Sequence, residues 1–345
     1  MCLRLCFLLL LIFFITQTRA QQTVDRVKFF RDTSVVNASL IFNTDKVLKK
    51  RSNGPLVLPA KFIWKVNDSI VLTDYVTIQV RGHFRRDNCS IPPLRIIYDT
   101  KGATVFRNLK DLKLVSPCQL RQADDKYLLK EFLIYRIYNL ITDKSFRARL
   151  LNLSYIDSAR KKVLFTRHAF LIEDVKDLAM RNKCVDWSKK IFAAEGTDRR
   201  QMTIVALFEY MIGNVDWSVP PRHNIKLIHT NTDSTSKPYV VPYDFDYTGL
   251  VDPEYAITSD GLKVKSLQFR LYRGCQRELS ELNEVIAVFN QQKEAIYNTI
   301  GNFNLLDRIT KHEMTSYLDG FYAIINRPSE VKEIFIESVK KLPPH

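Results

Sequence analysis

The stretch from Leu207 to Gly249 reads LFEYMIGNVDWSVPPRHNIKLI, then HTNTDSTS, then KPYVVPYDFDYTG. It starts with apolar residues at helical spacing, which predict the end of a buried helix. A turn that carries Asp216 comes next, and Asn224 lies eight residues after it. Asp216 could simply cap this turn, because Asp is favoured in turns. We favour a catalytic role for it, because Asn224 and, further along the chain, Asp244 could hold a metal ion beside it.

Two short apolar strands come next, Ile225 to Ile228 and Tyr239 to Val241, joined by a turn rich in Asn, Thr, Ser and Asp. The second strand leads into Asp244 and Asp246. Residues two apart share one face of a strand, and Asp is depleted from strands, so this pair needs an explanation. An exposed strand face is one explanation. We favour a metal site, because Mg²⁺ takes one or two carboxylates together with phosphate oxygens and water.

The rest of the chain is rich in strands before this stretch and in helices after it. Alternating or β-branched runs predict strands at Val35–Phe42, Leu56–Val66, Tyr75–Arg81, Leu94–Tyr98, Leu112–Val115, Ala148–Ile156 and Val163–Ile172. Helical spacing predicts helices at Tyr127–Leu140, Asp174–Arg181, Arg199–Ile212, Arg277–Ile300, Leu305–Ile325 and Ser329–Lys341. Apolar residues cover most of the first of these helices, so we expect it to be well buried. Periodicity alone therefore predicts an α+β protein.

The N-terminus has the features of a secretory signal. An arginine precedes an apolar run from Leu5 to Ile15, and small residues stand at Thr18 and Ala20. We predict that residues 1–20 are a signal peptide and that the protein is exported to the periplasm, the cell surface or the medium. A membrane anchor is the less favoured alternative, because the apolar run is short for a span.

The net charge of the chain is strongly positive. Its formal value of +15 falls to +13 when Arg4 and Arg19 leave with the signal. Such a charge favours anionic partners, among them nucleotides and an anionic envelope surface. No nucleic-acid-binding motif accompanies it, so nucleic acid is not expected as a partner. We expect a monomer.

Four cysteines remain after cleavage: Cys89, Cys118, Cys184 and Cys275. An even number in an exported protein predicts disulfides, with three connectivities open. Cys89 and Cys118 flank two strands of one predicted sheet, so we favour that pair. The chain has no CxxC, and a structural zinc site is therefore not expected.

Several short segments together resemble a known family. They are VRGHFRR, LKLV followed by a helix, AFLIEDVKDLA, the loop with Asp216 and Asn224, and PYDFD. Their order resembles that of the CotH family of atypical exported kinases, most closely its exported Bacteroidetes members, over Val35 to Gly274. The resemblance implies transfer of the terminal phosphate of ATP to a protein acceptor with Mg²⁺ or Mn²⁺.

The resemblance also implies a fold and a set of roles. The fold would be protein-kinase-like and two-lobed, with a β-rich N-lobe over 21–172 that includes the buried helix (about 125–141), and a helical C-lobe over 173–345. Asp216 would be the catalytic base, and Asn224 and Asp244 would hold the metal ions. Asp246 would reach the metal or hold Asp244 in place. Glu173 would lie between the lobes, near the adenine.

The phosphate-binding residues are assigned by spacing. Lys113 lies 18 residues before Glu131, which suits the lysine–glutamate pair that grips nucleotide phosphates in kinases. Arg95 is the alternative to Lys113, and a structural ion pair is the alternative role for Glu131, because a buried charge must be paired. Arg81 and Gly82 would cover the phosphates, Gly82 by letting the backbone approach them.

Two features depart from ordinary kinases. The interval between Asp216 and Asn224 is eight residues rather than five, which could tilt Asn224 out of the metal site. The chain has only 10 glycines and no multi-glycine phosphate loop. Two other functions therefore stay open: a non-catalytic kinase-like module that binds an anionic or protein partner at the envelope, and an exported metal-dependent hydrolase. His223 is expected to be structural rather than a phosphate contact.

Overall fold

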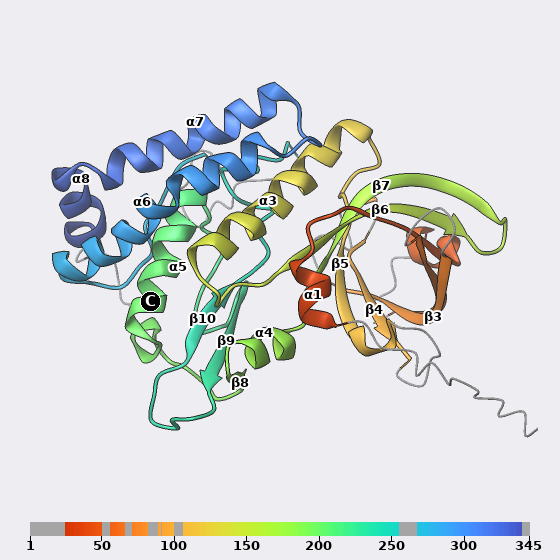
Figure 1. The fold of residues 1–345 in the computed structure, drawn as a ribbon, viewed down its shortest axis with the longest axis horizontal. Coiled ribbons are helices and arrows are strands. Elements are labelled where there is room, and N and C mark those ends of the chain that lie inside the picture. Colours follow the sequence, from red (N-terminus) through yellow and green to blue (C-terminus); the bar gives the residue numbers. More distant parts are fainter. Residues whose placement is uncertain are drawn as a thin grey trace, which may run out of the picture.

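The protein was analysed as a computed structural model (Figure 1). The structure describes residues 25–49, 56–65, 71–81, 89–90, 92–99, 106–254 and 268–339. The predicted signal peptide and Gly82 lie outside these residues. In the described part of the chain, no helix is long and apolar enough to cross a membrane.

Seven strands of the described residues close into a barrel, seen on the right of Figure 1. Its strand order is β1-β2-β3-β4-β5-β7-β6. The barrel closes because β1 pairs with β6 in parallel, with Val36 opposite Leu151 and Phe42 opposite Asp157. The strand bounds are β1 Val36–Phe42, β2 Val57–Lys65, β3 Val71–Val80, β4 Leu94–Tyr98, β5 Asp111–Val115, β6 Ala148–Asp157 and β7 Lys162–Ile172.

The closed barrel shows that the prediction of a two-lobed protein-kinase-like fold was wrong, although the α+β class is compatible with the structure. The alternation of apolar and polar residues correctly predicted the barrel strands, but it does not indicate which strands pair. The parallel β1–β6 pair joins segments more than a hundred residues apart, and nothing in the local pattern announces it. The predicted buried helix, α3 (Asp125–Ile141), also packs with the C-terminal helices instead of within the barrel core.

The barrel has an aromatic core of its own. Burial alternates along β2, so that Phe62 and Trp64 point inward. The Trp64 ring lies 4.4 Å from that of Phe62 and 4.4 Å from that of Phe106, measured between centroids. Large aromatic side chains dominate the energetics of a core because each removes much apolar surface from water.

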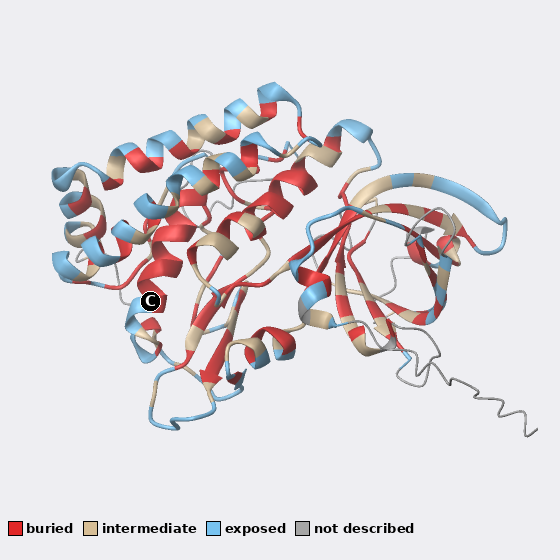
Figure 2. Cartoon of the chain, in the orientation of Figure 1, coloured by how far each residue is buried: buried red, intermediate tan, exposed pale blue. Residues whose placement is uncertain are grey.

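The second core joins long helices to a small sheet. Figure 2 shows that α3 and α5 (Arg199–Ile212) are buried along most of their length, which was predicted for α3. They pack together through Tyr138 and Phe208, whose rings stack at 4.1 Å. The other α-helices of the described residues are α1 Arg26–Arg31, α4 Val175–Arg181, α6 Leu279–Gly301, α7 Arg308–Ile325 and α8 Pro328–Lys332.

The small sheet has the order β10-β9-β8. Its strands are β8 Cys184–Asp186, β9 Ile225–Thr230 and β10 Tyr239–Pro242. The β9–β10 hairpin was predicted from the sequence, whereas β8 and α1 were not. At only three residues, β8 is too short to give a period.

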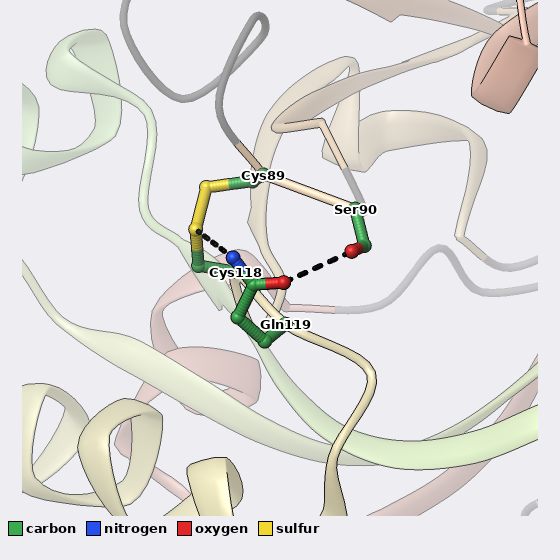
Figure 3. Close-up of a disulfide and its surroundings, with 4 residues drawn as sticks. All are labelled: Cys89, Ser90, Cys118 and Gln119. Atoms are coloured by element: carbon green, nitrogen blue, oxygen red, sulfur yellow. Dashed lines mark hydrogen bonds between the residues drawn. A yellow bond between two sulfur atoms is a disulfide. The ribbon is translucent and has the colours of Figure 1, made fainter. Parts of the chain in front are cut away.

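The favoured disulfide between Cys89 and Cys118 is present, and it ties the segment before β4 to the end of β5 (Figure 3). Next to it, the Ser90 hydroxyl donates to the Gln119 side-chain oxygen at 3.0 Å. The bridge spans 29 residues of sequence, and a loop of that length gives about 3–4 kcal/mol in the chain-entropy model. Cys184 and Cys275 are buried and free.

Candidate functional site

The loop that carries Asp216 is held in place by the end of α5 and by hydrogen bonds with two side chains. Gly213 ends α5 in the left-handed conformation, with φ 70°. A Cβ there would come within 2.1 Å of the Tyr317 hydroxyl, so glycine is required. The Asn214 side-chain oxygen accepts from the Asp216 backbone N–H at 2.9 Å. Arg273 donates to the carbonyls of the residues on either side of Asp216, at 2.5 and 2.8 Å.

Asp216 and Asn224 are in direct contact. The Asn224 Nδ2 donates to Oδ2 of Asp216 at 3.1 Å and to its backbone oxygen at 2.8 Å. Two backbone hydrogen bonds between Ser218 and His223, both 3.0 Å, fold the intervening residues into a closed turn. This turn accommodates the additional residues between Asp216 and Asn224, so Asn224 stays in contact with Asp216.

His223 contacts the same carboxylate. Its Nε2 lies 2.8 Å from Oδ1 of Asp216, so the two oxygens of Asp216 contact different side chains. The sequence predicts a structural role for His223, and orienting Asp216 is the role that this contact supports. The carboxylate itself remains exposed.

The hairpin brings Asp244 beside Asn224. The β9–β10 ladder continues past Pro242 through a bond from the Tyr243 N–H to the Asn224 oxygen, 3.0 Å long. Asp244 comes next with φ 71°, and its backbone N–H donates to the Tyr135 hydroxyl at 2.9 Å. Within the described residues, the half-buried Asp244 carboxylate accepts no hydrogen bond and forms no ion pair.

Lys113 reaches the hairpin from the barrel. It lies on β5, and its Nζ is 3.9 Å from the centre of the Tyr243 ring. Burial, followed by the nearby charges of Arg81 and Lys226, lowers the pKa of Lys113 to about 7, and the charge of Asp244 opposes this shift. Three other cations, Arg81, Lys226 and Arg95, thus lie near Lys113. The Arg95 guanidinium is paired with Asp111 at 3.1 Å.

Glu131 lies in the buried part of α3, one turn before Tyr135. Burial, followed by the charges of Glu131 and Asp244, raises the pKa of Tyr135 well above its ordinary value. Both acids are therefore near this hydroxyl. The direct pair between Lys113 and Glu131 stays a prediction, since the described contact of Lys113 is with Tyr243.

The remaining predicted residues have other surroundings. The Arg81 Nε donates to the Leu94 oxygen at 3.4 Å, at the end of β3. Glu173 is buried and paired with Arg181 at 2.9 Å, which gives it a structural contact at the end of β7. Asp246 is buried in the turn after Asp244. Their roles toward a nucleotide or a metal stay predictions.

Sequence reasoning missed Glu209. It lies on α5 and is 1% exposed, and neither carboxylate oxygen has a hydrogen-bond partner within the described residues. Burial raises the pKa of Glu209 to about 8, the nearby Asn214 amide opposes this shift, and the charge of Asp216 adds to it. Its position between Phe208 and Tyr210 on a helix buried almost all round was the available signal, because an acid there must lie in the core.

The acids partly fit a metal. Within the described ranges, no three His, Cys, Asp or Glu side chains gather closely enough to hold one. The Asp244 carboxylate and the Asn224 amide oxygen are nevertheless hard oxygen donors. They suit Mg²⁺, which keeps several waters and takes phosphate oxygens as ligands.

Comparisons with known proteins give little further guidance. No protein-family model matches the chain, and no curated protein matches it. Among solved structures it is similar to the proinflammatory kinase CtkA of Helicobacter pylori, with 10% identity and a TM-score of 0.38 over 72% of this chain and 93% of that chain. A likeness this distant carries no argument, so the function has to be inferred from the site. Membership of the CotH family stays a prediction.

Proposed function

We propose that the protein is a metal- and ATP-dependent phosphotransferase that acts on a hydroxyl, most readily of a protein acceptor. This proposal rests on one observation: two groups of residues with complementary chemistry lie next to each other. One group is Asp216 in contact with Asn224 and His223. The other group is Asp244 with the cations around Lys113. Phosphoryl transfer depends on such positioning and charge stabilisation.

The cations suit a polyphosphate. Burial and, after it, the nearby charges of Arg81 and Lys226 lower the pKa of Lys113. An anion among them would reverse that effect, because an opposite charge nearby favours the charged form of lysine. A bound triphosphate would thus raise the pKa of Lys113 and favour its charged form.

Asp216 suits the acceptor. Its carboxylate is exposed and oriented by His223 and Asn224, so an incoming hydroxyl could be aligned by it and give up its proton to it. ATP and a divalent metal, when bound, would supply the phosphoryl group and neutralise its charge. Asp244 and Asn224 would hold the metal.

We also propose that this activity is exported. The disulfide between Cys89 and Cys118 supports this, because disulfides persist in oxidising compartments and are rare in the cytosol.

The test is the intact mass of residues 21–345 after incubation with ATP and Mg²⁺ or Mn²⁺, with casein as a second acceptor. We expect a gain of phosphate in the wild type and none in Asp244→Ala, whereas the exposed control Asp143→Ala should behave like the wild type. A gain of AMP instead would identify a nucleotidyl transferase. No transfer and no ATP consumption would refute the proposal.

A binding module is the second candidate, because the cation cluster around Lys113 could hold an anion without reaction. Tight ATP binding without turnover would favour it. Metal-dependent cleavage that needs no nucleotide would favour the hydrolase.

A further inference from the structure

The chain that comes after β8 runs toward the candidate site. β8 is antiparallel to β9, with Asp186 opposite Ile228. The pairing continues with a bond from the Trp187 N–H to the Leu227 oxygen, 2.9 Å long. Since β9 begins at Ile225, directly after Asn224, the residues after β8 approach that end of the sheet. Figure 1 shows β8 and β9 side by side.

This segment contacts the Asp216 loop through one side chain. The Arg222 guanidinium donates to the Lys189 backbone oxygen. The next residue, His223, contacts the Asp216 carboxylate. We call Trp187, Lys189, Lys190, Phe192 and Arg222 the basic strip.

The basic strip combines cations with aromatic rings. Trp187 stacks on His229 with 4.5 Å between ring centres, and the Lys189 Nζ lies 5.1 Å from the Trp187 ring. The Lys190 Nζ lies 4.9 Å from the Phe192 ring, and Phe192 is 79% exposed. Cation–aromatic contacts stabilise these side chains only slightly at an exposed site. The Phe192 ring therefore adds exposed apolar surface directly beside the lysines.

We propose that the basic strip binds an acidic segment of the protein acceptor and leads its hydroxyl to Asp216. This inference rests on the proposed phosphotransferase function. Two lysines and an arginine on the strip give charge complementarity to an acidic chain, and Phe192 offers an apolar anchor of the kind that dominates interfaces. The exposed acids Asp186 and Glu195 lie at the ends of the strip and leave its net charge positive.

The first experiment measures binding without ATP. The probe is a fluorescently labelled random copolymer of glutamate and tyrosine, and the readout is anisotropy at low and high salt. We expect the double variant Lys189→Glu/Lys190→Glu to bind about tenfold more weakly at low salt, with a smaller difference at high salt because the charges are exposed.

The matched control changes the same charge elsewhere. Lys161 and Lys162 are an adjacent exposed pair at the β6–β7 turn, far from β8 in Figure 1. Lys161→Glu/Lys162→Glu should bind like the wild type. For the apolar anchor, Phe192→Ser should weaken binding severalfold, whereas Ile309→Ser on α7, where the residue is 74% exposed, should not.

Three outcomes would overturn the inference. Equal losses in both lysine pairs would show a response to net charge alone, and no loss in either would show that the strip is not used. Strip-dependent binding to phosphatidylglycerol vesicles, without copolymer binding, would identify a membrane surface instead. Because this assay needs no turnover, a failed transfer assay refutes the proposed function while copolymer binding still reports on the strip.

Discussion

The barrel core and the helical region behind the candidate site each bury an acid, and the two acids have different surroundings. In the barrel core, the buried acid Asp74 accepts a bond from the Trp64 Nε1 at 3.1 Å. Behind the site, the buried Glu209 has no such partner within the described residues. Burial raises the pKa of Asp74 to about 6 and that of Glu209 to about 8. The Asp74 carboxylate is thus hydrogen-bonded inside the barrel core, whereas Glu209 lies beside the loop of Asp216 without a hydrogen bond within the described residues.

The backbone of the site also adopts an unusual conformation. Among the described residues with positive φ, Arg222, Asn224 and Asp244 lie at the site end of the β9–β10 hairpin, whereas Lys110 and Lys161 lie next to barrel strands. Each such residue costs about 1 kcal/mol or more. The apolar packing of α3 and α5 next to this hairpin contributes to offsetting that cost.

The comparison predicts that changes at the site reduce activity and spare stability. Asp216→Asn should lower phosphotransfer by about 10²–10⁴-fold, because the acceptor loses its base. Unfolding in urea should shift by less than about 1 kcal/mol, since asparagine can keep a contact with Asn224. Rates of phosphate transfer and urea curves on the same sample check both parts. A large loss of stability would mean that Asp216 is a structural cap.

The reverse is predicted for the barrel. Trp64→Ala should destabilise the protein by about 3–5 kcal/mol, because it removes a buried ring and the bond to Asp74. Activity per folded molecule should stay within about threefold of the wild type. The urea midpoint and active-fraction-corrected rates are the measurements. Loss of activity in molecules that remain folded would break the separation between the two regions.

Glu209 gives the pH dependence. Its folded pKa of about 8 lies above the ordinary value of 4.5. The unfolded chain therefore releases this proton first, and stability falls as pH rises from about 4.5 to about 8. Glu209→Gln should remove this fall, which is worth of order 4 kcal/mol. Urea unfolding at pH 5 and pH 8 measures it. If the free energy of unfolding changed equally with pH in both proteins, Glu209 would be ionised in the folded state.

The smallest expected effect concerns Lys113, which lies on barrel strand β5 and contacts Tyr243 after β10. Lys113→Met should weaken ATP binding by about 10–100-fold, or about 1.4–2.8 kcal/mol, and should leave the fold intact. Isothermal titration calorimetry gives the affinity, and Lys61→Met on the barrel surface is the control. Unchanged affinity would indicate that Arg81 or Arg95, rather than Lys113, binds the phosphates of ATP.

Much of the local structure could be read from the sequence. Alternation marked the barrel strands, an apolar surface marked α3, and cysteine spacing with strand order favoured the bridge that is present. Turn residues located the hairpin that brings Asp244 beside Asn224. These features depend on neighbours within a few residues, so a local pattern carries them.

Tertiary structure alone decided the rest. The hydrophobic period of a strand indicates which face each residue occupies, but it does not indicate which strand lies beside it. The parallel pairing of β1 with β6, which closes the barrel, was therefore not predicted. The sequence by itself supplied the acids, the asparagine and the lysine of the site. Only the fold put Lys113 over the Tyr243 ring and buried Glu209 behind Asp216. Proton affinity depends on burial and neighbouring charges, and both are set by distances that the linear chain does not contain.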